Sequence, residues 1–495
     1  PEQALQEGGF TIIGAAADKQ PEDMGLTTDG GFGGYIQDED GNWIQVFKYA
    51  NYPDAPVSAE GTSRHNTMSF GGDNQIPELK ADVYDDIAQS DLDKMGDSTA
   101  LVFVSRSGSE SLDKKADAYD DGTPHFLALS KNERDMIDFA KESCDSVVLI
   151  VNSSNPMELT PVMQGDSEVD AIIWAGHPGD QGFRSVADIL SGEVNPSGRL
   201  VDLFATDFTK TPSYNNWGKF NYTNADNSPF VEYREGMYNG YRYYETRYED
   251  AVLAQGNAGD FDYDAQVVYP FGYGLSYGAE DGLPFAQEVV SSKMSDDGLE
   301  MQVKVTNNGT AAGKNVVELY AQQPYTCGGI EKSAVQLVGF DKTDILEPGQ
   351  SETVTITVPK KEFSSYDYRT DKTYVLDAGD YHFAIGNSAH DALNNILAAQ
   401  GKTVEDGMDA EGDAEKVYLW NNAKKTLLNV SYSGDEVTNR FDDASLEYYG
   451  EDTDYLTRSD WSTFPESYTD LTATADMMAA IDAEGSYEPG SSDTS

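Results

Sequence analysis

The stretch YLTRSDWSTF, from Tyr455 to Phe464, contains residues that could take part in cutting a sugar. Its centre is the triplet Ser459-Asp460-Trp461, in which a carboxylate stands next to an indole. In retaining glycoside hydrolysis a carboxylate attacks the sugar, and an indole offers a flat face on which a pyranose ring can stack. Asp460 is therefore a candidate nucleophile, and its role depends on the elements that surround it.

The regions upstream of this triplet show two kinds of pattern. Residues 99–200 contain the apolar runs TALVFVS, DSVVLIV and DAIIW, which alternate with amphipathic stretches and indicate buried, mostly parallel strands separated by helices. The helix expected after Ser130 carries Glu133 three residues later, the spacing of a capping box. From about residue 285, short alternating strands separated by turn signals predict a β-sandwich of about seven strands.

We therefore predict a multidomain protein of the α/β plus all-β class. An α/β/α sandwich with a mostly parallel sheet is expected over residues 1–205, with a truncated start, and a β-sandwich over residues 285–392. Between them, residues 206–284 form a tyrosine-rich excursion and junction, whose rings either pack on the domain or form an aromatic rim for sugars. Residues 393–495 are expected to be an acidic connector and tail.

The charge of the chain argues against several kinds of partner. Its 495 residues include 33 Lys and Arg against 87 Asp and Glu, a formal net charge of −54, which repels nucleic acid and anionic membrane surfaces. No run approaches the roughly 18 apolar residues of a membrane span. The first residue is not Met, and we expect a processed or fragmentary start.

The sequence gives no sign of a metal or cofactor site. Two distant cysteines, Cys144 and Cys327, form neither a disulfide framework nor a zinc site. No group of His, Cys, Asp and Glu residues has metal-ligand spacing. We therefore expect no metal and no cofactor.

Three segments resemble glycoside hydrolase family 3, and they occur in the order found in that family. They are DAIIWAGHPGDQGFRSVADILSGEVNPSGRL from Asp170 to Leu200, REGMYNGYRYYE from Arg234 to Glu245, and VYPFGYGLSY from Val268 to Tyr277. Together with the predicted β-sandwich, the resemblance covers about residues 100–390. It implies that the β-sandwich is a fibronectin type III-like domain.

The resemblance implies a retaining, exo-acting β-glycosidase of the β-glucosidase type. Such an enzyme hydrolyses terminal β-linked sugars of an oligosaccharide or a glucoside. A β-xylosidase specificity stays open, as does a non-catalytic carbohydrate-binding or structural module. An extracellular or cell-surface location in a bacterium is expected, with a cytoplasmic location left open.

The resemblance also implies where the catalytic acid lies. The stretch VSRSGSESLDKKAD is similar to the family pattern R-x-S-G-E-G-x-D-R, which places Glu110 as the general acid/base. By the same match Arg106 and Asp113 are expected to contact the substrate, and His177 is a further candidate for contact with a leaving-group sugar. Glu133 is the competing acid, but its place at a helix start favours the capping box.

The match departs from the family pattern on both sides of Glu110 and at its last position. Ser109 and Ser111 flank Glu110 where the family has glycines, which stiffens the loop. Lys114 replaces the last arginine, which keeps the charge but loses the bidentate fork.

The catalytic barrel of the family is not recognisable in this sequence. In the family the barrel supplies the nucleophile, an Asp in an S-D-W triplet. Asp460 follows the acidic, irregular stretch EYYGEDTDYLTR and precedes STFPESYTD, which has no strand pattern, so we reject it as the nucleophile. The triplet instead resembles the approach to a barrel in a member with reversed domain order. We expect that barrel, on the same polypeptide, to be the partner of this chain, and the chain alone to be inactive.

Overall fold

A computed structural model describes most of the chain, which divides into two compact units. The first unit contains Pro1–Val194 and Phe204–Phe208, and the second contains Asn195–Leu203 and Thr209–Ser495. The described residues are 34–37, 43–46, 81–87, 89–106, 116, 118–119, 122–216, 220–225, 229–439, 448, 455–463 and 471–485. Within these ranges, no helix is long and apolar enough to cross a membrane.

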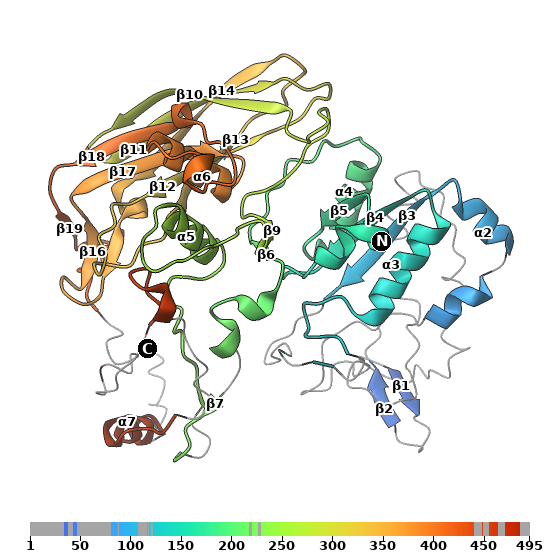
Figure 1. The fold of residues 1–495 in the computed structure, drawn as a ribbon, viewed down its shortest axis with the longest axis horizontal. Coiled ribbons are helices and arrows are strands. Elements are labelled where there is room, and N and C mark those ends of the chain that lie inside the picture. The colour runs from blue at the N-terminus through green and yellow to red at the C-terminus, as the bar shows by residue number, and fades with distance from the viewer. Residues whose placement is uncertain are drawn as a thin grey trace, which may run out of the picture. The chain divides into compact units, whose positions relative to one another are not determined.

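A three-stranded parallel sheet forms the centre of the first unit, as the apolar runs predict (Figure 1). Its strands lie in chain order: β3 (Thr99–Ser105), β4 (Ser146–Asn152) and β5 (Ala171–Trp174). Helix α3 (Lys131–Ser143) packs on β3 and β4, and Phe183 of helix α4 (Gly179–Leu190) contacts Phe103 of β3. Strand β4 has a neighbour on each side and is buried, which explains its continuous apolar sequence.

The predicted capping box at the start of α3 is confirmed. The Ser130 hydroxyl accepts a hydrogen bond from the backbone N–H of Glu133, at 3.1 Å. The Glu133 carboxylate accepts one from the backbone N–H of Ser130, at 2.7 Å. These two bonds satisfy donors that a helix end leaves without intrahelical partners.

Shorter elements complete the described part of the first unit. They are β1 (Gly34–Gln37) and β2 (Trp43–Val46), which pair antiparallel, η3 (Ala81–Asp86), α2 (Gln89–Met95), η4 (Thr160–Val162), η5 (Gly165–Ser167) and β6 (Phe204–Ala205).

The second unit contains the β-sandwich, which has seven strands (Figure 1). Its last strand lies at residues 417–422, in the stretch expected to be a connector, so the sandwich extends beyond the predicted end at residue 392. A three-stranded sheet pairs β10 (Phe285–Met294), β11 (Gly298–Asn307) and β14 (Ser351–Pro359). A four-stranded sheet has the order β13 (Gln336–Lys342), β12 (Val316–Gln322), β17 (Gly379–Gly386) and β18 (Val417–Asn422).

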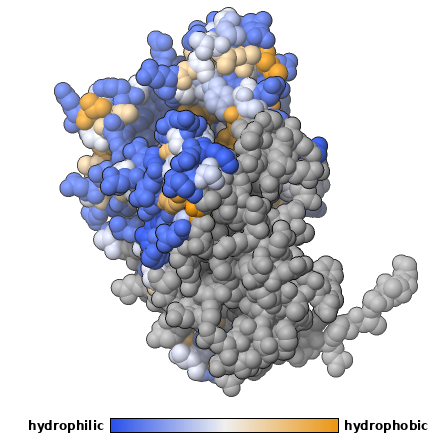
Figure 2. Space-filling view, turned by 90° about the vertical axis from the view of Figure 1, so that its right-hand side faces the viewer, coloured by the Kyte–Doolittle hydropathy of each residue, from blue (hydrophilic) through white to orange (hydrophobic). Residues whose placement is uncertain are grey.

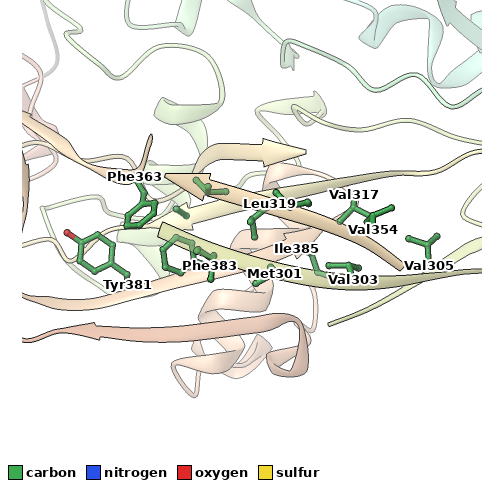
Figure 3. Packing of buried hydrophobic residues seen from close by; sticks show 14 of the residues in the cluster. Met301, Val303, Val305, Val317, Leu319, Val354, Phe363, Tyr381, Phe383 and Ile385 are labelled. Carbon is green, nitrogen blue, oxygen red and sulfur yellow. The ribbon is translucent and has the colours of Figure 1, made fainter. Parts of the chain in front are cut away.

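Alternating residues of these strands fill the core between the two sheets (Figure 3). Every second residue of β11 is fully buried, because its side chains alternate between the core and the outer face. Phe363 joins the core from outside the sheets, and its ring makes an edge contact with Phe383 at 5.0 Å between centroids.

The tyrosine-rich excursion contributes rings to the interior of the second unit. Helix α5 (Tyr241–Val252) contains three buried tyrosines, Tyr243, Tyr244 and Tyr248, and Tyr238 is buried just before it. The sequence left open whether the rings pack on the domain or form an aromatic rim for sugars. These four rings pack on the domain. Helix α6 (Ala389–Ala399) packs on α5 and on β17.

The other described elements of the second unit are short. They are β15 (Ser365–Asp367), β16 (Thr373–Leu376) and β19 (Thr426–Leu428), which form a three-stranded sheet, β7 (Phe220–Asn221) and β8 (Pro229–Phe230), which pair, β9 (Val267–Tyr269), η6 (Phe208–Lys210), η7 (Tyr214–Asn216), η8 (Lys360–Phe363), η9 (Val404–Asp406), η10 (Ala414–Lys416), η13 (Trp461–Thr463) and α7 (Ala475–Gly485). Residues of η6 lie at the boundary between the two units.

The described surface drawn in Figure 2 is largely hydrophilic, with small apolar areas. This agrees with a net charge of −54, since most of the charged side chains have to remain solvated.

Replacing Phe363 by alanine tests the core of the β-sandwich. Because Phe363 is fully buried, Phe363→Ala leaves a cavity, and we expect the free energy of unfolding to fall by about 3–5 kcal/mol. Phe340→Ala is the matched control, since Phe340 is 68% exposed, and it should change the stability by less than about 0.5 kcal/mol. Chemical denaturation followed by fluorescence measures both, and equal effects would contradict this core.

Candidate functional site

The carboxyl ends of the parallel strands lie at one edge of the sheet in the first unit. The strand register pairs Ser105 of β3 with Asn152 of β4, and Val151 of β4 with Trp174 of β5. The Trp174 indole N–H donates to the carbonyl of Ser153, at 2.6 Å, and so ties the ends of β4 and β5 together. Functional groups of such sheets usually lie in the loops beyond this edge.

Arg106 follows β3 directly and is buried, with a side chain only 1% exposed. Its guanidinium donates to the Glu133 carboxylate from both terminal nitrogens, at 2.5 and 2.8 Å. It also donates to the carbonyls of Phe126 and Ala128, at 2.7 and 2.8 Å. The structure thus gives Arg106 a positioning role at the strand end, and its predicted contact with substrate stays a prediction.

Glu133 has the electrostatics of an ionised structural group. Burial by itself raises the pKa of Glu133, but the charge of Arg106 and the hydrogen bonds from Arg106 and Ser130 lower it below the ordinary value. A catalytic acid needs the opposite, a pKa raised toward neutrality, so that it holds its proton until transfer. The geometry therefore favours the capping role that the sequence predicts for Glu133.

His177 lies beyond the end of β5, and its imidazole contacts the backbone of Arg106, next to the end of β3. Its Nε2 atom is 2.8 Å from the backbone carbonyl oxygen of Arg106, so an Nε2–H donates to that oxygen. The backbone of His177 has a φ of 53°, in the left-handed region that few residues other than glycine adopt. Contact of His177 with a sugar stays a prediction, as does the role of Glu110 and Asp113, which lie outside the described residues.

A buried histidine in this region was not predicted from the sequence. His125 Nδ1 accepts the backbone N–H of Leu127, at 3.2 Å, so Nε2 carries the proton and donates to Glu158, at 3.0 Å. The Glu158 carboxylate also accepts a hydrogen bond from the backbone N–H of Phe208, at 2.7 Å. Thirty-three positions separate His125 from Glu158, and no local pattern connects residues at that distance.

Among the described residues, no three His, Cys, Asp or Glu side chains are grouped so that they could hold a metal ion. The described polar side chains at the strand ends of the first unit include hydroxyl and amide groups, such as Ser105 and Asn152, besides the arginine, histidine and carboxylate groups.

The Ser-Asp-Trp triplet lies in the second unit, and its tryptophan is an anchor. Trp461 is 3% exposed, and its indole N–H donates to the Asp250 carboxylate, at 2.8 Å. Its ring makes edge contacts with Tyr238 and Tyr243, at 5.3 and 5.9 Å between centroids. Because the indole is buried and contacts Asp250, Tyr238 and Tyr243, its ring is not exposed for stacking on a sugar.

Asp460 points away from this anchor. Its carboxylate accepts hydrogen bonds from Asn257, at 3.1 Å, and from the backbone N–H and hydroxyl of Ser462, at 3.0 and 2.7 Å. Hydrogen bonds from Ser462 and Asn257 lower the pKa of Asp460. A short turn with an Asp at its start explains this geometry. The rejection of Asp460 as nucleophile stays a prediction.

Arg458 joins the same segment to helix α5. Its guanidinium is 3% exposed and donates to the carboxylates of Glu249, at 2.7 Å, and of Asp250. It also donates to the carbonyl of Lys332, at 3.0 Å, and lies 4.2 Å from the centre of the Tyr325 ring. Two adjacent carboxylates are buried here, and the single positive charge of the arginine offsets one of them. Burial and the charge of Asp250 raise the pKa of Glu249, which favours its neutral form.

Comparison with known protein families accounts for both units. Residues 10–241 match the model of the glycosyl hydrolase family 3 C-terminal domain, and residues 315–389 match that of the fibronectin type III-like domain. Residues 10–241 are therefore similar to the C-terminal domain of glycosyl hydrolase family 3. The predicted family and its fibronectin type III-like domain are thereby confirmed.

Individual relatives are β-glucosidases. The chain is 32% identical over 322 residues to β-glucosidase A of Butyrivibrio fibrisolvens, which covers 59% of this chain and 36% of that protein. It is 30% identical over 302 residues to a β-glucosidase of Ruminococcus albus, 59% of this chain and 27% of that protein. The chain thus spans about a third of the length of these relatives.

Solved structures give the same result. A β-glucosidase of Paenibacillus barengoltzii is similar with a TM-score of 0.52 at 27% identity, covering 73% of this chain and 34% of that one. β-Glucosidase 3B of Thermotoga neapolitana in complex with α-D-glucose is similar with a TM-score of 0.51 at 26% identity, covering 68% and 40%.

The second unit contains another buried charge network, around His390. His390 on α6 lies between two carboxylates, with Nδ1 2.8 Å from Glu245 and Nε2 2.7 Å from Asp409. Its ring stacks on Tyr263, at 3.7 Å between centroids. Burial alone lowers the pKa of His390, but the charges of Glu245 and Asp409 and the hydrogen bonds to them raise it to about 10. The hydrogen bond from His390 and its positive charge in turn lower the pKa of Asp409 to about 2.

Replacing Arg458 tests whether the triplet segment is a structural anchor. Arg458→Met leaves Glu249 and Asp250 buried without their cation, and we expect the free energy of unfolding to fall by about 3–5 kcal/mol. Asp460→Asn, two residues away, should leave stability unchanged within the error of chemical denaturation, because it removes no buried charge. A stable Arg458→Met protein would show that the carboxylates are neutralised in another way.

The pH dependence of stability tests the His390 network. Below the unfolded pKa of about 6.5 both states carry the proton, and the network stabilises the protein fully. As the pH rises toward 10 only the folded state keeps the proton, so this stabilisation falls by up to about 1.4 kcal/mol per pH unit. Wild type should therefore lose stability between about pH 7 and 10 more steeply than His390→Gln, in urea unfolding at several pH values.

His382→Gln is the control for this experiment. Burial lowers the pKa of His382, so the contribution of that group changes only below about pH 6.5, where the unfolded state takes up a proton. The alkaline slope of His382→Gln should equal that of wild type. An unchanged alkaline slope in His390→Gln would rule out the charged histidine.

Proposed function

We propose that this chain is the part of a retaining, exo-acting β-glucosidase that supplies the general acid/base, Glu110. One observation carries the proposal: in a chain that matches the family 3 C-terminal domain, strand β3 ends at Ser105, and the anchored Arg106 that follows it lies four residues before Glu110. The similarity to proteins named β-glucosidases supports a terminal β-linked glucosyl residue as the substrate.

The described contacts hold Arg106 in place, and the stretch that contains Glu110 follows Arg106 in the chain. Arg106 is held by Glu133 and by two backbone carbonyls, and its own carbonyl accepts a hydrogen bond from His177. A proton donor has to reach the glycosidic oxygen within hydrogen-bond distance. Because Glu133, two backbone carbonyls and His177 all hold Arg106, the chain that follows Arg106 starts from a fixed position. A fixed start helps to place Glu110 within this distance.

The proposed reaction has two steps and conserves its protons. In the first, Glu110 gives its proton to the glycosidic oxygen while a second carboxylate attacks the anomeric carbon, and the bond to the leaving group breaks. In the second, Glu110, now a carboxylate, takes a proton from water, whose oxygen attacks the anomeric carbon; the bond from that carbon to the second carboxylate breaks and the sugar is released. We assign the second carboxylate to a barrel on the same polypeptide and not to Asp460.

The variant Glu110→Gln tests the proposed acid in the complete polypeptide that carries this chain. Its kcat/KM should fall by about 10²–10⁴-fold on cellobiose, whose leaving group needs protonation, and by less on 4-nitrophenyl β-glucoside, whose leaving group does not. Added azide should restore turnover of the nitrophenyl substrate, because it attacks the glycosyl intermediate without a general base. The matched control is Glu142→Gln, on the exposed side of α3, with unchanged activity.

Two outcomes would overturn the assignment. Equal losses on both leaving groups, with no rescue by azide, would show that Glu110 is not the acid. Turnover by the 495-residue chain alone would show that its own residues supply both carboxylates. Assays on β-xyloside and β-glucoside in parallel separate the two sugar specificities.

A second candidate is a non-catalytic module that binds carbohydrate or spaces other domains. The fibronectin type III-like match is the observation that favours it. A complete polypeptide without hydrolytic activity on any of these substrates, in wild-type form, would support the module and contradict the enzyme.

A further inference from the structure

A buried carboxyl group lies on the outer face of the four-stranded sheet of the β-sandwich. Val317, Leu319 and Ala321 of β12 point into the core, so Glu318, which alternates with them, points to the opposite face. Glu318 is nevertheless only 5% exposed, and it accepts a hydrogen bond from the Tyr320 hydroxyl, at 2.9 Å. One neutral donor compensates little of the cost of a buried charge, so this environment favours the neutral carboxyl.

Residues 270–275, which we name the junction turn, lie against this carboxyl. A Cβ atom on Gly272 would lie 2.2 Å from Glu318 Oε2, and one on Gly274 would lie 2.8 Å from Arg199 Nη1. Because both positions are glycines, the two side chains lie directly against the backbone of the turn. The junction turn therefore contacts an acid and a base at positions two residues apart.

Arg199 and its neighbour hold the junction turn by hydrogen bonds. The Arg199 guanidinium donates to the carbonyl of Gly274, at 2.8 Å. The next residue, Leu200, donates to the carbonyl of Tyr273 and accepts from the backbone N–H of Gly272, each at 2.8 Å. One of these three bonds to the turn depends on the position of the Arg199 side chain, and the other two join backbone groups.

Charge links the Glu318 carboxyl to the Arg199 guanidinium. Burial raises the pKa of Glu318 to about 7, while the hydrogen bond from Tyr320 and the charge of Arg199 lower it. Burial also lowers the pKa of Arg199, and the charge of Glu318 raises it. Glu318 is therefore neutral in most molecules at about pH 6 and ionised in most at about pH 8.

Other titratable groups surround this pair. They are Tyr241 and Glu245 on α5, Lys314 before β12 and Lys342 on β13. The first two act on the Tyr320 hydroxyl, whose pKa is raised by burial and by the charge of Glu318. Burial and the charges of Lys314 and Arg199 lower the pKa of Lys342. Tyrosine and lysine ordinarily titrate at about pH 10 and glutamate at about pH 4, so Glu318 is the group at this turn that changes charge around neutral pH.

We propose that Glu318 and Arg199 form a pH-sensitive switch that acts on the junction turn. While Glu318 is neutral, the Arg199 guanidinium stays on the carbonyl of Gly274. When Glu318 releases its proton to solvent, its negative charge attracts the guanidinium and the bond to Gly274 is lost, because opposite charges interact strongly where water is excluded. The turn then keeps its two backbone bonds to Leu200 and opens more often.

Hydrogen–deuterium exchange of the whole 495-residue chain at pH 6 and pH 8 tests the switch, each rate being divided by the intrinsic rate at that pH. In wild type we expect the protection of the Gly272 and Leu200 amides to fall by about ten-fold from pH 6 to pH 8, the effect of losing one hydrogen bond. Glu318→Gln stays neutral and keeps an oxygen that accepts from Tyr320, so its protection should change by less than about two-fold. Arg199→Met cannot hold Gly274 and should show low protection at both pH values.

Matched controls separate the turn from the rest of the second unit. Glu288→Gln removes a glutamate of the same β-sandwich whose side chain is 72% exposed, and its protection should fall as in wild type. The core amides of β11 report opening of the whole sandwich, so the change at the turn is measured relative to them. Thermal unfolding at pH 6 shows whether each variant is folded.

Wild type alone also tests the switch, so the test does not depend on the folding of a variant. Exchange measured in steps from pH 5 to pH 9 should give a midpoint at about pH 7. A midpoint at about pH 5 or below, the range of an ordinary glutamate, would overturn the proposal, as would a turn whose protection does not change relative to β11. A loss in Glu318→Gln or in Arg199→Met as large as that in wild type would exclude these two groups. The readout is amide exchange and does not depend on the hydrolytic activity proposed above.

Discussion

Helix α5 carries three buried carboxylates, and the second unit depends on their neutralisation. Glu245, Glu249 and Asp250 are each at most 5% exposed. An ionised carboxylate taken out of water without a partner costs several kcal/mol, so each needs a cation or several hydrogen bonds. The cations come from distant parts of the chain: His390 from helix α6 and Arg458 from the segment beyond the β-sandwich.

This constraint gives the segment around the Ser-Asp-Trp triplet a structural role, although the triplet resembles a catalytic motif. Arg458 and Trp461 both bind Asp250, and they fix the segment between them on α5. Asp460 then lies on the outer side of the turn, where its partners are Asn257 and Ser462. A motif of three residues gives the chemistry that its side chains could perform, and the fold around it decides which of them face solvent.

The first unit shows the same physical principle at the end of a strand. Arg106 is buried with Glu133, and the pair is fixed by a helix start on one side and by backbone carbonyls on the other. An arginine with two terminal nitrogens on one carboxylate is rigid, because the fork geometry fixes both groups. The strand end is thereby firmly placed, and His177 adds a bond to its backbone carbonyl. A catalytic group on an adjoining loop would be positioned more precisely because the strand end that precedes it is fixed.

Local patterns in the sequence determined the class of both units. Apolar runs without alternation predicted the parallel strands, since a strand covered on both faces has no polar side, and alternation predicted the β-sandwich. The spacing of Ser130 and Glu133 predicted the start of α3, because a capping box lies within one turn of helix. Only the tertiary structure decided the partners of Arg106, Arg458 and His390. Each of these cations binds a carboxylate from 19 to 209 positions away, and no sequence periodicity encodes a contact that exists only once the chain has folded.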